Sequence, residues 1–192
     1  MINNSVEKRD ELIMKKSIFL SYPRAVNEQQ DRFIKALEEY LKSIQLEPRT
    51  LGVTDYDYKV PLQTIRSLMF ECNGLINVSF KRYQIVQGSK KSRIGNDKDI
   101  SGKWFTSPYS QIEPAMAFQM GLPTLIIKEK GVISDGMLEL GAMANYIPEF
   151  SLDDECKVGE FFKLDETKSV FDSWKVDVGE VYKKKGLPNH LY

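Results

Sequence analysis

The sequence predicts an α/β domain with a central parallel sheet and helices on both of its faces. Two features of the 192-residue chain support this prediction. Short segments of continuous apolar residues have the length and composition of strands that are buried on both sides. Amphipathic segments with helical spacing alternate with them, which is the order that a parallel sheet with crossover helices requires. Such sheets bind their ligands at the carboxyl ends of the strands, next to the reversal of strand order.

The first half of the chain is expected to supply three strands and two helices. Phe33, Leu37 and Leu41 recur at helical spacing and charged residues lie between them, which indicates an amphipathic helix. A second helix is expected to stop at Gly74, because glycine enters the left-handed conformation that ends many helices. We expect strands at residues 17–22, 46–51 and 75–80, and helices at residues 27–43 and 62–72.

Residues 81–103 interrupt this alternation with seven Lys or Arg residues, three glycines and little apolar periodicity. A loop of this length inside a compact domain is usually functional or mobile. After it, the spacing of Ile112 and Met116 predicts a short helix, and the hydroxyl of Ser107 or Ser110 could cap its first turn. We expect further strands at residues 122–127 and 147–152, and a terminal helix within residues 160–186.

The predicted domain covers residues 17–152, with an N-terminal extension at 1–16 and a C-terminal helical extension at 153–192 packed on it. The formal charge is zero, which does not point to nucleic acid or an anionic membrane as a partner. No apolar run approaches the ~20 residues of a membrane span, and no signal peptide is recognised, so we expect a cytoplasmic protein. The single histidine, His190, argues against His-based triads and His-rich metal sites, and we expect no metal.

Glu113 is the carboxylate of greatest interest, because it lies early in a short helix among mostly apolar neighbours. One interpretation is a first-turn glutamate that interacts favourably with the helix dipole. The other is a catalytic carboxylate. The loops after the strands contain no GxGxxG or GxxxxGK[ST] motif, which argues against phosphate binding of the Rossmann or P-loop kind.

The order and spacing of these segments resemble those of a TIR domain, in particular the ThsB-like TIR proteins of bacterial Thoeris antiphage systems. The resemblance covers residues 17–152 and implies a flavodoxin-like fold. It implies cleavage of the bond between nicotinamide and ribose in NAD, which is the substrate and not a cofactor. It also implies a cyclic ADP-ribose signal that diffuses to an antiphage effector. The segments that carry it are IFLSYP (18–23), DYDYKVP (55–61), GLINVSFKRY (74–83) and IEPAMAFQMGLPTLII (112–127).

By this resemblance Glu113 is the catalytic residue. Nicotinamide leaves as a neutral amide, so one carboxylate could suffice where most glycosidases need two. Water would give free ADP-ribose and a ribose hydroxyl would close a ring, and the sequence does not decide between them. The residues expected to bind substrate are Ser21, Tyr22, Pro23, Arg24, Phe80, Lys81, Trp104 and Tyr109.

Several of these residues have a structural interpretation of equal weight. Arg24 could be an exposed residue that flanks a helix, and Phe80 could belong to the core. Lys81 could be solvated, and Trp104 could also be a core residue. Asp55 and Asp57 fit solvated turn residues better than site residues.

Two other functions remain open from the sequence. A nucleoside 2-deoxyribosyltransferase also uses a glutamate at an N-glycosidic carbon, as a covalent nucleophile. A TIR-like adaptor would act through protein contacts and would not depend on Glu113. Self-association is compatible with each of these functions.

Overall fold

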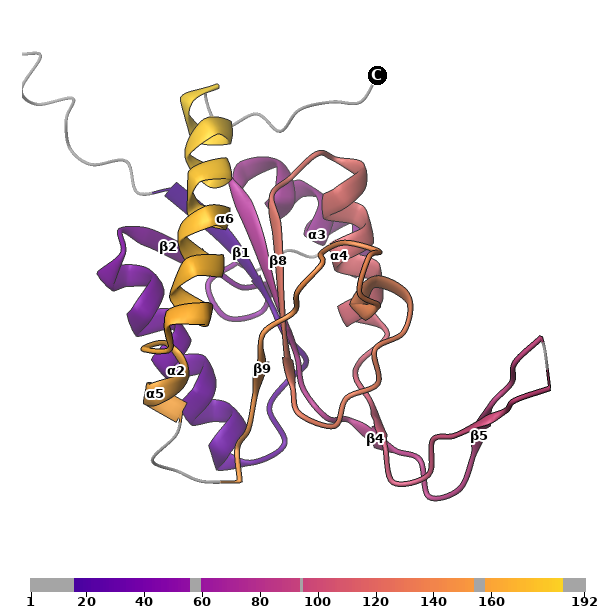
Figure 1. Cartoon of the computed structure of the whole chain (residues 1–192). Helices are drawn as coiled ribbons and strands as arrows, with labels where there is room; N and C mark the ends of the chain where they lie inside the picture. Colours follow the sequence, from indigo (N-terminus) through magenta and orange to yellow (C-terminus); the bar gives the residue numbers. More distant parts are fainter. Residues whose placement is uncertain (1–15, 56–59, 94, 154–157, 185–192) are drawn as a thin grey trace, which may run out of the picture.

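The computed structural model describes residues 16–55, 60–93, 95–153 and 158–184. Its centre is a five-stranded sheet in the order β2-β1-β3-β8-β9, and every neighbouring pair is parallel. This confirms the predicted α/β class and the flavodoxin-like strand order (Figure 1). The strands are β1 (Lys16–Ser21), β2 (Leu46–Arg49), β3 (Gly74–Ser79), β8 (Thr124–Glu129) and β9 (Glu149–Phe150).

The order of strands reverses at β1, because the chain places β2 on one side of β1 and then crosses to place β3 on the other. In open α/β sheets this is the point where the crossover helices diverge and leave room for a ligand. Ser21 is the last residue of β1 and pairs in register with Asn77 of β3. These two residues therefore mark the position that the fold offers to a ligand.

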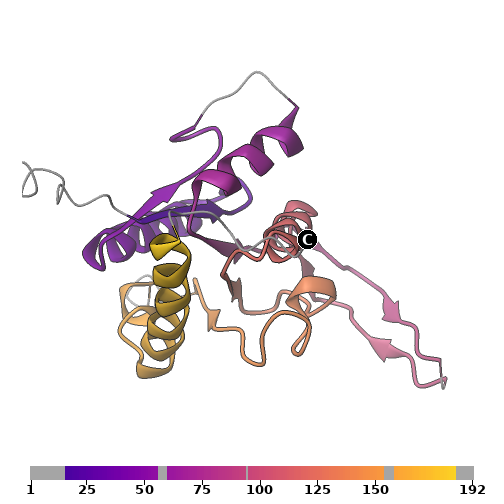
Figure 2. The same ribbon diagram turned by 90° about the horizontal axis from the view of Figure 1, so that it is seen from above.

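Helices cover both faces of the sheet, as the alternating sequence pattern predicted (Figure 2). Helix α2 (Glu28–Ser43) begins where the Asn27 side chain accepts a hydrogen bond from the N–H of Gln30 at 2.9 Å. It shares its face of the sheet with α5 (Val158–Phe161) and α6 (Asp165–Lys183). The opposite face carries α3 (Pro61–Glu71) and α4 (Tyr109–Gln119).

The alternation of side chains along β1 divides the core in two. Ile18 and Leu20 point to the face of α2 and α6, where aromatic rings dominate the packing. Phe19 points to the face of α3 and α4, where aliphatic side chains dominate. Because side chains alternate along a strand, Ser21 shares the α3 and α4 face with Phe19. The two faces thus have different chemistry: one is a closed aromatic core, and the other ends in polar groups.

The described residues between 83 and 105 form a narrow two-stranded arm where the sequence predicted a long loop. The arm consists of β4 (Tyr83–Gln84) paired with β7 (Trp104–Phe105), and of β5 (Ser89–Lys90) paired with β6 (Lys98–Asp99), all antiparallel. It projects away from the sheet at the lower right of Figure 1. Its side chains are mostly exposed and polar, so no apolar alternation marked these strands in the sequence.

Helix α6, the last element in the described residues, packs against the sheet. The indole of Trp174 in α6 is buried and donates a hydrogen bond to the carbonyl of Pro123 at 3.1 Å.

The loop before β9 contains a short 3-10 helix, η1 (Gly136–Leu138). Of the helices in the described ranges, none combines the length and apolar character needed to cross a membrane.

Candidate active site

Glu113 is almost completely buried in the first half of α4, with 8% of the residue exposed. Burial raises the pKa of its carboxyl group to about 7, because the charged form loses contact with water. A hydrogen bond from the Ser21 hydroxyl favours the charged form and lowers this pKa in part. The helix dipole alone would also lower the pKa of a first-turn glutamate. The upward direction therefore identifies burial, and not the dipole, as the dominant influence on this group.

A chain of buried hydrogen bonds leads from β3 to Glu113. The Ser79 hydroxyl donates to Oδ1 of Asn77 at 2.7 Å, and Nδ2 of Asn77 donates to Oγ of Ser21 at 2.9 Å. Oγ of Ser21 thus accepts from Asn77, so its own proton remains available for the carboxylate of Glu113. When Glu113 is ionised, each bond has only one chemically allowed direction. The chain therefore presents a hydrogen-bond donor to Glu113 and favours its ionised form.

Replacement of Ser21 by alanine is expected to raise the pKa of Glu113 further. The substitution removes a hydrogen bond to a charged group, which typically stabilises the charged form by about 1.5 kcal/mol or more. The pKa can be followed by carbon NMR of the labelled glutamate carboxyl groups. Ser173→Ala in α6, on the other face of the sheet, is the matched control. An unchanged pKa in Ser21→Ala would show that the Ser21 hydroxyl does not reach Glu113.

The residues that follow β1 diverge from the candidate site. Ser21 contacts Glu113, but Tyr22 packs against the core on the face of α2. Pro23 is buried, and the side chain of Arg24 is exposed. The carbonyl of Arg24 accepts a hydrogen bond from Nη1 of Arg82 at 2.7 Å. Of the four residues expected to line the substrate here, the structure brings Ser21 into contact with the carboxylate.

Phe80 does not lie with Glu113, and its buried ring presents no exposed face for the expected stacking on a substrate. Its ring is fully buried on the α2 face of the sheet, where it packs edge-on against Phe33 and Phe150. Lys81 directly follows and is tied to Glu129 through its backbone N–H at 3.0 Å and its ammonium group at 3.4 Å. The core interpretation of Phe80 is confirmed, and Lys81 has a structural ion pair.

The two aromatic residues expected near Glu113 have different surroundings. Trp104 is half-buried and packs against a small cluster that contains Val132 and Leu138, which favours its core interpretation. Tyr109 is 42% exposed and is the first residue of α4, one helical turn before Glu113. Residues four apart lie on the same side of a helix. Tyr109 therefore remains a candidate to contact a ligand beside Glu113.

The start of α4 differs in detail from the expected capping. The Ser107 hydroxyl accepts a hydrogen bond from the N–H of Tyr109 at 3.3 Å, while Pro108 occupies the cap position. The Ser110 side chain is buried and interacts with Thr106 at 3.2 Å. Ser107 thus satisfies one backbone group before the helix, and Ser110 fixes the first turn from inside.

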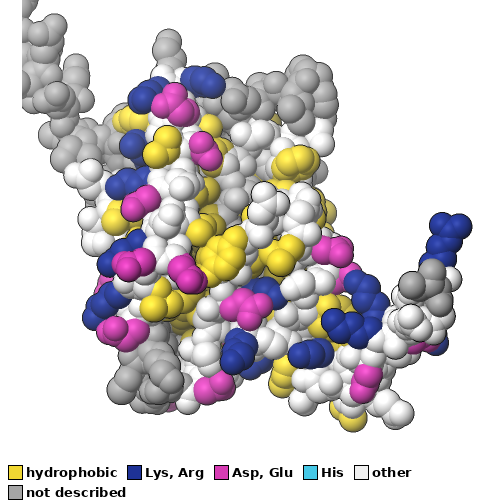
Figure 3. Space-filling model, viewed as in Figure 1, with side chains coloured by type: hydrophobic (Ala, Val, Ile, Leu, Met, Phe, Trp, Pro, Cys, Tyr) yellow, Lys and Arg dark blue, Asp and Glu magenta, His cyan; other side chains and the backbone are white. Residues whose placement is uncertain are grey.

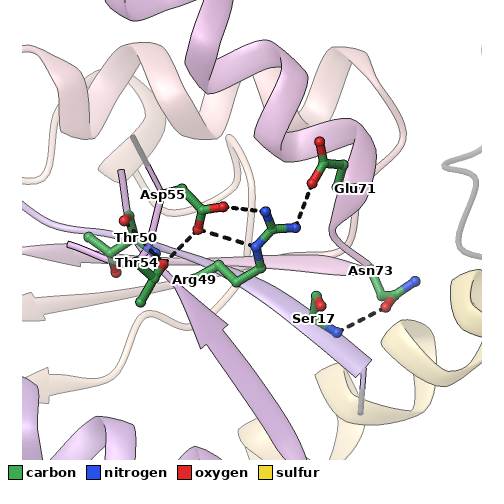
Figure 4. Close-up of polar contacts among 7 residues, drawn as sticks. All are labelled: Ser17, Arg49, Thr50, Thr54, Asp55, Glu71 and Asn73. Carbon is green, nitrogen blue, oxygen red and sulfur yellow. Dashed lines mark hydrogen bonds and ion pairs between the residues drawn. The ribbon is translucent and has the colours of Figure 1, made fainter. Parts of the chain in front are cut away.

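Asp55 has a structural partner in the guanidinium group of Arg49 (Figure 4). Arg49 donates to both carboxylate oxygens of Asp55, and its Nη1 lies 2.8 Å from Glu71. The interaction with Arg49 is the main reason why the pKa of Asp55 lies below its usual value. Asp55 therefore closes the turn after β2, as expected, but as an ion-paired residue and not as a solvated one. Asp57 and His190 lie outside the described residues.

Asn77 and Ser79 belong to the site and were not selected from the sequence. They lie in a strand whose other residues are apolar, and both are completely inaccessible to solvent. The sequence does contain a pattern that could have identified them. Two polar residues, two positions apart, point to one face of a strand that is otherwise apolar. Buried polar groups require partners, so this pattern predicts a polar neighbour on the same face.

Comparisons with known proteins give no family assignment. No family model matches the chain, and no curated protein matches it. Among solved structures, the chain is similar to the CMP N-glycosidase BcmB of Clostridium botulinum, with 19% sequence identity and a TM-score of 0.45. The similarity covers 78% of this chain and 98% of that one.

This comparison corrects the identification as a TIR domain. The solved structure named above is a CMP N-glycosidase, and no family model, TIR or other, matches the chain. The functions inferred from the TIR resemblance are overturned with it: NAD cleavage, formation of cyclic ADP-ribose and a role in Thoeris defence. The α/β fold expected from the sequence is independent of that resemblance and stands on the strand order.

Proposed function

We propose that this chain cleaves the N-glycosidic bond of a nucleoside or nucleotide, with Glu113 acting on the anomeric carbon of the sugar. The observation that carries the proposal is a buried carboxyl group, with a pKa of about 7, hydrogen-bonded to the last residue of β1. Strongly perturbed carboxyl groups at such positions are candidates for catalysis. Of the alternatives that the sequence left open, the nucleoside 2-deoxyribosyltransferase reaction belongs to this class.

The position of Glu113 supports the proposal. Ser21 ends β1 and Asn77 lies beside it in β3, so both flank the reversal of strand order. Ligands of open α/β sheets bind in the crevice outside the carboxyl ends of the strands at this point. A sugar bound there would lie at the end of β1, toward which α4 directs the Glu113 side chain.

The proposed reaction has two steps. The Glu113 carboxylate forms a bond to C1′ as the bond between C1′ and the base nitrogen breaks, and the base leaves with the electron pair and takes up a proton from water. Water, or the nitrogen of a second base, then attacks C1′, releases the carboxylate and gives up a proton to solvent. Attack by water is hydrolysis, and attack by a base is transfer.

The burial of Glu113 gives a physical reason for rate acceleration. An ionised carboxylate with little access to water is destabilised, and the Ser21 hydroxyl compensates only part of this cost. Positive charge develops on the sugar as the glycosidic bond breaks. The attraction between the two charges is stronger in a site of low dielectric than in water, and it is greatest in the transition state.

The proposal is tested with a panel of ribonucleosides, 2′-deoxyribonucleosides and their 5′-monophosphates. We expect the wild-type protein to release free base from at least one class, as followed by chromatography. Addition of a second free base distinguishes the two outcomes of the second step, because transfer yields a new nucleoside and hydrolysis yields the free sugar. Folded protein that releases no base from any member of the panel would contradict the proposal.

A further inference from the structure

The structure contains a second candidate ligand site at the base of the arm. A cavity of about 580 Å³ lies between the arm and the loop after β8. We refer to it as the lysine cavity, because Lys90, Lys98, Lys103, Lys128 and Lys130 line it. In Figure 3, dark blue side chains gather where the arm leaves the body of the molecule. Its volume is within the range of small-molecule sites.

The lysine cavity carries an excess of positive charge although the whole chain has a formal charge of zero. Three carboxylates also line it, Asp99, Glu139 and Glu149, against the five lysines. The lining therefore has an excess of two positive charges, and the charge of Lys90 is in addition paired with Asp135 just outside the lining. A local excess of this kind attracts anions from solution even when the net charge of the protein is zero.

Lys128 forms a fixed, charged wall of this cavity. Only 7% of its side chain is exposed, and its ammonium group lies 2.6 Å from Oγ of Ser134 and 2.8 Å from Oε1 of Glu149. A buried ammonium group is strongly unfavourable unless it is paired and hydrogen-bonded, so these contacts hold it in place. A built-in buried charge distinguishes this cavity from a chance gathering of surface lysines.

Three lysines of the cavity are available to a ligand. In the described ranges, the ammonium groups of Lys98, Lys103 and Lys130 have no carboxylate within ion-pair distance. Lys90 instead pairs with Asp135 at 2.8 Å and ties the arm to the start of η1. The cavity thus combines anchored charges with free ones, which is suited to a ligand with several anionic groups.

Backbone hydrogen bonds hold the two sides of the cavity together. The N–H of Trp104 donates to the carbonyl of Gly131 at 3.1 Å, and the N–H of Ile133 donates to the carbonyl of Trp104 at 2.9 Å. These bonds connect the base of the arm to the loop after β8. The backbone segments that carry the lysines on both sides are therefore held in place before a ligand binds, which reduces the entropic cost of binding.

We propose that the lysine cavity binds a small ligand that carries a polyphosphate chain. Lysine ammonium groups bind phosphate as point charges, and linked phosphates would engage Lys98, Lys103 and Lys130 together. Glu113 does not line this cavity, and its partner Ser21 is in β1, whereas Lys128 is in β8. The proposal is thus independent of the reaction assigned to Glu113.

The test is calorimetric titration of the full chain with inorganic tripolyphosphate at low ionic strength. We expect saturable binding that the double variant Lys98→Ala/Lys103→Ala weakens at least about 10-fold, because two charge-assisted contacts are lost. Lys91→Ala is the matched control: it removes a charge from the same arm, but Lys91 pairs with Asp97 and does not line the cavity. Glu139→Gln is expected to tighten binding, because it removes a negative charge from the cavity.

Three results would overturn the proposal. The first is the absence of saturable binding by the wild-type protein. The second is an equal loss of affinity in Lys91→Ala, which would indicate general attraction to the arm. The third is tighter binding of a single-stranded oligonucleotide than of tripolyphosphate, which would identify the arm as a nucleic-acid surface. Thermal melting of each variant checks that the fold is retained, and base release by the wild-type protein is measured separately.

Discussion

Glu113→Gln is expected to lower the rate of base release by about 1,000-fold or more, while the protein remains folded. Glutamine has almost the same shape as glutamate, and its side-chain oxygen can accept the hydrogen bond from Ser21. It cannot supply the negative charge that attacks or stabilises C1′, and removal of a covalent nucleophile commonly costs several orders of magnitude in rate. The measurement is the initial rate of base release with the best substrate of the panel.

The same substitution is expected to stabilise the protein at high pH. The pKa of Glu113 is about 7 in the folded chain, against an ordinary value of 4.5. Below pH 4.5 the group is neutral in the folded and unfolded states and has no effect on stability. As the pH rises to 7 and above, the unfolded state gains a well-solvated charge first, so the folded state becomes relatively less stable.

The size of this effect follows from the two pKa values. The difference corresponds to roughly 3 kcal/mol of folding free energy that is lost above pH 7 and that Glu113→Gln should restore. Urea unfolding at pH 4 and pH 8 measures it: the variant should match wild type at pH 4 and exceed it at pH 8. Glu180→Gln, an exposed residue of α6, is the control. Equal stability of Glu113→Gln and wild type at both pH values would show that the carboxylate is well solvated.

Phe33→Ala is expected to lower the free energy of unfolding by about 3–5 kcal/mol, because truncation of a buried ring leaves a cavity. Phe33 is fully buried in α2 and stacks on Phe150 of β9 with the ring centroids 3.8 Å apart. It also contacts the rings of Phe80, Phe161 and Phe162. One side chain thus connects α2, the sheet edge and the C-terminal helices.

Denaturant unfolding measures this loss, and Phe118→Ala serves as the control. Phe118 is an aromatic residue of α4 with 58% of its surface exposed, so its truncation should change stability by less than about 0.5 kcal/mol. The fraction of Phe33→Ala protein that remains folded should release base at a nearly normal rate, since Phe33 and Glu113 pack on opposite faces of the sheet. A small effect on stability would mean that the aromatic core tolerates a void.

The fold was predictable because its signals are local and repeated. The spacing of Phe33, Leu37 and Leu41 marks α2, and buried runs mark β1, β3 and β8. The arm was not predictable in the same way, since its strands are two residues long and their exposed side chains have no apolar pattern. Its structure depends on pairing between distant segments.

The candidate site was predictable in part. Ser21 was selected because it ends a strand, and Glu113 because it lies early in a mostly apolar helix. The side of the sheet that a strand residue occupies depends on register. Ser21 pairs with Asn77, and this alternation directs Phe80 to the opposite face. A list of residues that follow strands cannot separate the two faces, which is why Phe80 was wrongly placed with the site.

The bond between Ser21 and Asn77 couples reactivity to correct assembly of the protein. If β1 slipped by one residue against β3, every side chain of β1 would change faces. Ser21 would then enter the aromatic layer beneath α2, and Leu20 would meet Asn77 instead. A misaligned molecule would lose the donor that stabilises the ionised Glu113 and would also bury an unpaired amide. The hydrogen bond between Ser21 and Asn77 therefore has two effects. It orients the donor to Glu113, and it can form only when β1 and β3 pair in the correct register.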